Sequence, residues 1–292
     1  MKERTSLADT YLLKHFYETC TDPDKKSIHC DGVKLWRKEY AWIDVFLCGE
    51  ATCGECPFAA DRKGIYYGKR TFSPGFEEQE YVDLKIRSQE EFESVCERVS
   101  PNVRGIRIFE SFVDGSPLEK FDKLEFISLS GQKISRFWDL SKNPELRFIN
   151  ICANRHFSSL AGLEKAKKLE CLHLWTHTSQ LSSIKIDSLA PLAGLKDLKD
   201  VTLSGVEPLD HNIDYLIDLP ALRYLWVSPN VFPMECYARF EAKKFMLGAE
   251  YGIYADEDND IFPFGKGKRV LHGAEQKNRY LHEYMELFKQ FK

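Results

Sequence analysis

One apolar pattern recurs six times between Val103 and Pro229, and it constrains the fold of this chain more than any other feature. Each copy has apolar residues at its first, fourth and sixth positions and favours asparagine at the ninth. By subtraction, the successive first positions lie 21, 22, 23, 29 and 24 residues apart: Val103, Leu124, Leu146, Leu169, Leu198 and Leu222. The fourth and sixth positions alternate with polar or aromatic residues, which is the period of a short strand. Since one such strand cannot bury an apolar face alone, the pattern predicts parallel strands that are stacked over one shared core.

The rest of each copy is predicted to turn away from the strand and return along a convex side. One further apolar residue on each return path is expected to close the coil: Leu118, Leu140, Leu163, Leu192 and Leu219. The amide at the ninth position is expected to hydrogen-bond backbone where the chain turns. Asn154 and Asn230 supply this amide, and Gln132 is a candidate. His177 and Val206 stand in its place in later copies, so the row of amides is predicted to be interrupted there.

The segment from Leu189 to Ser204 resembles repeats of the internalin type, and residues 80–245 resemble bacterial leucine-rich-repeat proteins. This resemblance implies an α/β leucine-rich-repeat solenoid with a parallel concave sheet. It also implies a binding scaffold rather than a reaction. A fold alone does not determine function, and the sequence does not identify the partner.

Three regions are predicted along the chain. Residues 1–75 form a small cysteine-containing α+β module, with a helix over 7–20 and strands over 33–48 and 64–72. Residues 76–245 form the solenoid and its N-terminal cap, a βαβ unit with a strand at 81–86 and a helix over about 89–99. An S-x-x-E capping box at Ser88 marks the start of that helix. Residues 246–292 form a C-terminal β-hairpin and a final helix over about 273–291, after a helix over 234–246.

The step between the fourth and fifth copies is the longest and contains inserted residues 179–185. Insertions in solenoids fall in loops on one face, often near a binding surface. The insertion is interpreted either as such a loop or as a tolerated surface loop.

Composition limits the classes of partner and the compartment. A net charge of −4 argues against a general nucleic-acid binder, which usually has a strong basic excess. No apolar run is long enough to span a bilayer, and the first residues lack the apolar stretch of a secretory signal. An odd number of cysteines, nine, favours reduced thiols. A cytoplasmic protein is therefore expected.

Cysteines are concentrated near the N-terminus, where they form a candidate zinc site. Cys48, Cys53 and Cys56 include a C-x2-C pair, and Cys30 completes a set of four, with His29 or Cys20 as alternatives. Zinc prefers four tetrahedral nitrogen or sulfur ligands. The alternative is that these cysteines are small buried side chains and residues of a glycine turn. Zinc is the one cofactor that the sequence suggests. A metal-dependent regulatory or nucleic-acid-binding module is the alternative function.

Residues that flank the middle apolar position of each strand point to the concave surface. Several are aromatic, which is unusual for solvent-facing positions without a partner, and aromatic anchors mark protein interfaces. The candidate partner-binding residues are Phe126, Phe148, Asn150, His173, Trp175, Thr202, Tyr224 and Trp226. Alternatively, the N-terminal module or the C-terminal helix folds over this face and buries the rings.

Motifs of catalysis are missing from the sequence. It contains no nucleophile elbow, zinc-protease, kinase or phosphate-loop pattern. His173 and His177 are four residues apart, but they fall in a strand and its turn rather than on one helix face. The sequence therefore predicts a non-enzymatic protein that binds another protein, of which an inhibitor or immunity-type role is one specific form. It does not determine the oligomeric state.

Overall fold

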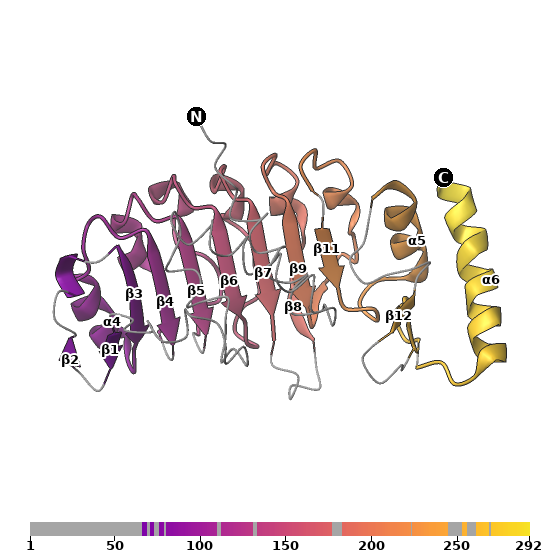
Figure 1. Ribbon diagram of the computed structural model, residues 1–292, viewed down its shortest axis with the longest axis horizontal. Coiled ribbons are helices and arrows are strands. Elements are labelled where there is room, and N and C mark those ends of the chain that lie inside the picture. Colours follow the sequence, from indigo (N-terminus) through magenta and orange to yellow (C-terminus); the bar gives the residue numbers. More distant parts are fainter. Residues whose placement is uncertain are drawn as a thin grey trace, which may run out of the picture.

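The computed structural model describes residues 66–68, 71–72, 76–78, 80–109, 112–130, 133–176, 183–222, 224–244, 253–255, 261–268 and 270–292. Within these residues one nine-stranded sheet runs along the molecule (Figure 1). Its order is β11 (Tyr224–Val227), β9 (Asp200–Ser204), β7 (Cys171–Trp175), β6 (Phe148–Cys152), β5 (Phe126–Ser130), β4 (Gly105–Phe109), β3 (Tyr81–Lys85), β1 (Tyr66–Gly68) and β2 (Thr71–Phe72). From β3 to β11 all neighbouring strands are parallel.

The strands pair in the register that the repeated pattern predicts. Ile149 lies opposite Leu172, and Leu172 lies opposite Val201. Every fourth and sixth position of the pattern is buried in one core cluster. Full burial of such a side chain contributes about 1.5–3 kcal/mol, so the stacked coils share a large apolar core. The predicted leucine-rich-repeat solenoid is confirmed.

Short 3₁₀ helices form the return side of successive coils. Their bounds are η2 (Ser116–Lys120), η3 (Leu140–Lys142), η4 (Leu163–Lys165), η5 (Ala190–Leu192) and η6 (Asp214–Leu216). The leucines predicted to close the coils are all buried in the same core, and four of them lie in these turns. The return-path prediction is therefore confirmed.

A second, two-stranded sheet joins the longest repeat to the repeat that follows it. Strand β8 (Ile184–Ile186) pairs in parallel with β10 (Val206–Pro208). The prediction of a loop is wrong for residues 184 and 185, whereas residues 177–182 lie outside the described residues. Val206 pairs with Ile184 and is buried, so an apolar residue replaces the expected amide because this position joins the core.

A buried amide joins neighbouring coils, but at a position that the pattern did not indicate. Asn143 is fully buried, and its Nδ2 donates to the carbonyl oxygens of Leu118 and Phe121, both at 2.9 Å. Its Oδ1 accepts from Trp138 Nε1 at 2.7 Å. Asn154, at the expected position, accepts from the backbone of His156 at 2.9 Å within its own turn.

The N-terminal cap agrees with the predicted βαβ unit. Helix α4 (Gln89–Cys96) follows β3, and β3 pairs in parallel with β4. Ser88 Oγ accepts from the backbone nitrogen of Glu91 at 3.2 Å, as a capping box requires. Strand β1 pairs with β3, and after β2 comes η1 (Phe76–Glu78), so the last strands expected in the 1–75 module lie in the solenoid sheet. The helix over 7–20 and the strands over 33–48 lie outside the described residues.

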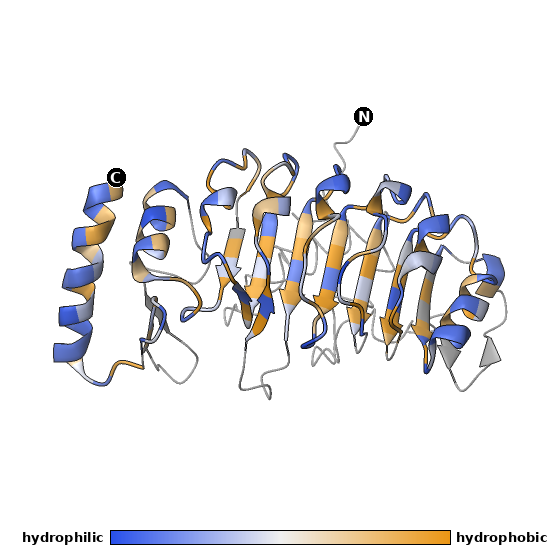
Figure 2. Ribbon diagram, turned by 180° about the vertical axis from the view of Figure 1, so that it is seen from behind, coloured by the Kyte–Doolittle hydropathy of each residue, from blue (hydrophilic) through white to orange (hydrophobic). Residues whose placement is uncertain are grey.

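At the other end, helices α5 (Met234–Lys243) and α6 (Ala274–Phe291) pack against each other beyond β11 (Figure 1). The predicted hairpin is confirmed as β12 (Ile253–Ala255) and β13 (Ile261–Pro263). Figure 2 shows the largely hydrophobic strands of the sheet and, at the far end beyond α5, the more hydrophilic α6. Helix α5 ends before residue 246, where its end was predicted. Among the described helices, none is both long and apolar enough to cross a membrane.

Candidate functional site

The concave face, defined as the face of the sheet opposite the core, carries the predicted partner-binding residues in aligned rows. The first row aligns Phe126, Phe148, Cys171 and Asp200 across β5, β6, β7 and β9, and Tyr224 follows on β11. The second row aligns Ser128, Asn150, His173, Thr202 and Trp226. Cys152 and Trp175 align in the third row. The structure therefore brings the predicted residues together on one face.

Two aromatic residues of the first row are buried, not solvent-facing as the sequence predicted. Phe126 and Phe148 are 1% and 2% exposed. Their rings stack at 4.6 Å between centroids with an angle of 18°, and Phe148 also lies 5.8 Å from the ring of His173. Strand spacing of about 4.8 Å places rings on adjacent strands in such contact. Helix α6 packs on α5, away from the strands β5 and β6 that carry these residues (Figure 1). Residues 1–65, which hold most of the N-terminal module predicted as the other possible cover, lie outside the described residues.

A hydrogen-bonded chain crosses three strands of this face. Asn150 Nδ2 donates to Ser128 Oγ at 3.0 Å, and Trp175 Nε1 donates to Asn150 Oδ1 at 2.9 Å. These bonds fix the orientation of the amide and of the indole ring. Trp175, Thr202 and Trp226 are only partly buried, in contrast to the two phenylalanines.

The sequence did not indicate that three potential metal ligands would meet on this face. Cys171, His173 and Asp200 are 0%, 6% and 3% exposed. Their ligand atoms all lie within 4.8 Å of one another, and His173 Nε2 is 3.8 Å from Asp200 Oδ1. Burial raises the pKa of the Cys171 thiol well above its usual value, and the nearby carboxylates of Asp200 and Glu170 add to this. The predicted register of the strands could have revealed this cluster, because Cys171 and Asp200 occupy adjacent positions of the first row.

A row of alternating charges runs along the edge where the strands begin. In the nine-stranded sheet, the residue directly before each strand from β3 to β9 is charged: Glu80, Arg104, Glu125, Arg147, Glu170 and Lys199. Arg104 Nη2 lies 2.7 Å from Glu125 Oε1, and Lys199 Nζ lies 3.2 Å from Glu170 Oε2. Arg147 also pairs with Glu170. This charge ladder was not predicted from the sequence.

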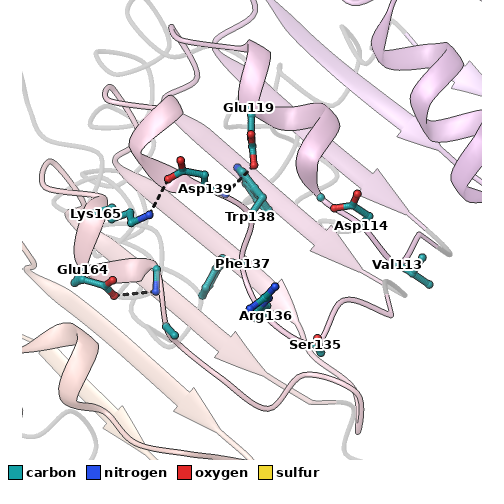
Figure 3. Close-up of a pocket in the computed structure, with 13 residues that line it drawn as sticks. Val113, Asp114, Glu119, Ser135, Arg136, Phe137, Trp138, Asp139, Glu164 and Lys165 are labelled. Carbon is teal, nitrogen blue, oxygen red and sulfur yellow. Dashed lines mark hydrogen bonds and ion pairs between the residues drawn. The ribbon is translucent and has the colours of Figure 1, made fainter.

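A pocket of about 660 Å³ lies beside η2, η3 and η4, away from the predicted site (Figure 3). Asp139 and Lys165 pair at 3.0 Å in its wall, and Glu119 Oε1 accepts from the backbone nitrogen of Asp139 at 3.0 Å. Hydrogen bonds from Ser141 and then Lys165 lower the pKa of Asp139 to about 2. Most of the charges here are satisfied by neighbouring protein groups, so the pocket does not suggest a particular ligand.

The N-terminal cysteines predicted to bind zinc lie outside the described residues. They are Cys30, Cys48, Cys53 and Cys56. The zinc prediction for this set therefore stays a prediction.

Comparisons with known proteins find likeness only among solved structures. No protein-family model and no curated protein matches the chain. Internalin C2 of Listeria monocytogenes is 20% identical, with a TM-score of 0.37 over 47% of this chain and 55% of that chain. A leucine-rich-repeat protein of Leptospira interrogans is 15% identical, with a TM-score of 0.46 over 61% of this chain and 47% of that chain. A plant membrane receptor kinase ectodomain from Arabidopsis thaliana is 12% identical, with a TM-score of 0.35 over 57% of this chain and 22% of that chain.

Bacterial leucine-rich-repeat proteins are thus among the structures that this chain resembles, and it spans about half the length of the two bacterial examples. The identities are low and the superpositions are partial. The assignment of the fold rests instead on the strand register and on the buried repeat positions of this chain.

Proposed function

We propose that this protein binds another protein through its concave face, with Trp175 and Trp226 as aromatic anchors. The observation that supports this most is the hydrogen-bonded chain from Ser128 through Asn150 to the indole of Trp175. An aromatic side chain that is already fixed in orientation loses less conformational entropy when a partner packs against it. Tryptophan is also enriched among residues that dominate binding energy.

The burial of Phe126 and Phe148 changes the role proposed for them. Rings that are 1% and 2% exposed offer almost no surface for a partner to cover. Phe126 and Phe148 support the second and third rows by packing. The partly buried residues of those rows make the contact with the partner protein. Trp175 and Trp226 lie on β7 and β11, two strand spacings apart, so about 10 Å of sheet separates them. Asn150 on β6 and Thr202 on β9 lie in the second row, where they contribute hydrogen bonds.

The same geometry supports a non-enzymatic role. Cys171 and His173 are a potential nucleophile and base, but the thiol is fully buried and its pKa is raised well above the usual value. Such a thiol carries little thiolate at neutral pH and is a poor nucleophile. The specific form of the proposal is an inhibitor whose concave face covers an enzyme or a toxin in the cytoplasm.

Replacement of both tryptophans tests this proposal. The double variant Trp175→Ala/Trp226→Ala should lose capture of the native partner from host lysate. Each anchor is worth at least ~2 kcal/mol of binding, about thirtyfold in affinity. The melting temperature should fall by only a few degrees, because each ring is partly buried and Trp175 donates one hydrogen bond to Asn150.

Val113→Ala/Leu209→Ala is the matched control, since both side chains are exposed apolar groups off the concave strands. Capture by this control should equal that of the wild type. Unchanged capture by the folded tryptophan variant would exclude the proposed anchors. A large fall in its melting temperature would instead show that the two rings are internal packing rather than anchors.

A further inference from the structure

We infer that Cys171, His173 and Asp200 form a binding site for one divalent transition-metal ion of the zinc class. The site is separate from the N-terminal cysteines and does not depend on the proposed protein binding. It lies on the concave face where β7 and β9 run side by side. The placement of the ligands, the environment of Asp200 and the chemistry of the set each support it.

The strand geometry makes all three side chains converge. Cys171 and His173 are two residues apart in β7, so they point to the same face of the sheet. Asp200 in β9 is the direct neighbour of Cys171 in the register. Parallel strands lie about 4.8 Å apart, so a residue pair on one strand and one residue on the next form a compact triangle. Their ligand atoms lie within 4.8 Å of one another, which one ion can span.

Asp200 is a buried carboxylate that lies beyond hydrogen-bond distance of the neighbouring His173. It is 3% exposed, and its nearest ionisable partner is His173 at 3.8 Å, which is too long for a hydrogen bond. Burial of a charged group is costly unless the group is paired or coordinates a metal. A divalent ion between Asp200 and His173 supplies the missing counter-charge.

The combination of a thiol, an imidazole and a carboxylate selects the class of metal. Magnesium and calcium prefer sets of oxygen ligands, whereas soft thiolate and imidazole ligands favour zinc and related ions. Zinc binds cysteine sulfur, histidine nitrogen and carboxylate oxygen, usually with tetrahedral geometry. Three protein ligands leave one tetrahedral position for a water molecule or a further ligand. Loss of the thiol proton on binding completes the charge balance, with two anionic ligands facing one divalent cation.

Metal analysis of the untagged full-length chain, purified without chelator, tests the site. The wild type should contain at least about one zinc per chain, or take it up from added Zn²⁺. Cys171→Ser and Asp200→Asn should each lower the zinc content by about one equivalent relative to the wild type. Cobalt(II) in place of zinc should give the thiolate-to-metal absorption band in the wild type, and Cys171→Ser should remove the part of it that Cys171 contributes.

Two controls distinguish this site from the other cysteines of the chain. Cys152→Ser removes another buried cysteine of the concave face, outside the cluster, and should keep the full zinc content. Cys53→Ser/Cys56→Ser removes a pair of the predicted N-terminal set, so any zinc lost there does not belong to the cluster. The melting temperature adds a second readout. Added Zn²⁺ should raise the melting temperature of the wild type by binding at the cluster, and Asp200→Asn should abolish the part of this rise that the cluster contributes.

Two results would overturn the inference. One is that Cys171→Ser and Asp200→Asn, folded as judged by circular dichroism, keep the zinc content of the wild type. The other is that the wild type neither contains nor takes up zinc or cobalt. If Cys171→Ser does not fold, Asp200→Asn decides alone, because the amide keeps the shape of the side chain and removes its charge.

Discussion

At the scale of single residues, Asn143 shows how one buried amide ties two coils together. Asn143→Ala would leave the indole nitrogen of Trp138 without its partner. It would also remove one of the two hydrogen bonds that each carbonyl group of Leu118 and Phe121 accepts. Each buried group that loses its partner costs about 1–3 kcal/mol. Each further hydrogen bond lost costs about 0.5–1.5 kcal/mol, so the free energy of unfolding, measured with urea, should fall by at least ~2 kcal/mol.

The matched control is Asn212→Ala. Asn212 Oδ1 accepts one local hydrogen bond, from the backbone nitrogen of Asp214 at 2.9 Å. Its replacement should cost about 1 kcal/mol or less. Equal losses for the two variants would mean that the amide of Asn143 does not hold the coils together.

The register of the core could be predicted residue by residue, whereas the role of Asn143 could not. A period of two leaves no choice of face for Leu172 once its neighbours are aligned, since a slip of one residue would expose every apolar side chain. Asn143 has no such constraint in the sequence, because an asparagine in a return segment is usually an exposed turn residue. Only the fold shows that the carbonyl groups of the preceding coil converge on it.

At the scale of elements, two tyrosines attach α6 to the rest of the molecule. Tyr280 Oη donates to the carbonyl oxygen of Phe264 at 2.8 Å, and Tyr284 Oη donates to Glu241 Oε2 of α5 at 2.6 Å. Both side chains are buried, and burial raises the pKa of each phenol above its ordinary value. Tyr280→Ala/Tyr284→Ala should therefore release α6, and its amide hydrogens should exchange faster.

The exchange should change locally, because each unit of a solenoid contacts only its neighbours. Strands β5 to β7 should keep the protection of the wild type. Glu286→Ala/Lys289→Ala is the control, since this exposed pair on α6 spans a single turn of the same helix. Faster exchange throughout the sheet in the tyrosine variant would show that α6 is part of the main cooperative unit rather than a docked end.

Element boundaries were predictable where a local signal sets them and not elsewhere. Ser88 caps α4 where the capping box predicted, because that motif satisfies the first backbone nitrogens of the helix. Strands β8 and β10 are three residues each and lack an alternating pattern long enough to recognise. They owe their existence to the pairing between the longest repeat and the next one, which is a tertiary effect. The cluster of Cys171, His173 and Asp200 likewise depends on two strands that are 29 residues apart at the cysteine and the aspartate.

At the scale of the whole molecule, the charge ladder follows the solenoid along the edge where the strands begin. The charges alternate in sign from Glu80 to Lys199, so neighbouring members of the ladder carry opposite charges. Like charges at the same position of neighbouring coils would repel at strand spacing. The alternation therefore favours one stacking order of the coils, in addition to the non-directional burial of the core.

Glu170 is the most informative position in this ladder, because it is 6% exposed at its side chain and faces Arg147 and Lys199. Glu170→Gln removes both attractions and leaves two cations about two strand spacings apart. At about 10 Å and an effective dielectric constant near 20, their repulsion is roughly 1.7 kcal/mol. Since the cations are 25% and 21% exposed, solvent screens part of this, and we expect a total loss of about 2–4 kcal/mol in urea unfolding.

Glu145→Gln is the matched control, because Glu145 pairs with Lys168 at 2.6 Å across neighbouring coils where both side chains are about half exposed. Its loss should stay below about 1 kcal/mol.

The slope of unfolding free energy against urea adds a test at the scale of the molecule. If repulsion at β7 weakens the contact between coils enough to divide the solenoid, Glu170→Gln should also lower this slope, because less surface unfolds in each step. Equal losses for the two glutamate variants would show that the ladder adds no more than exposed surface pairs do.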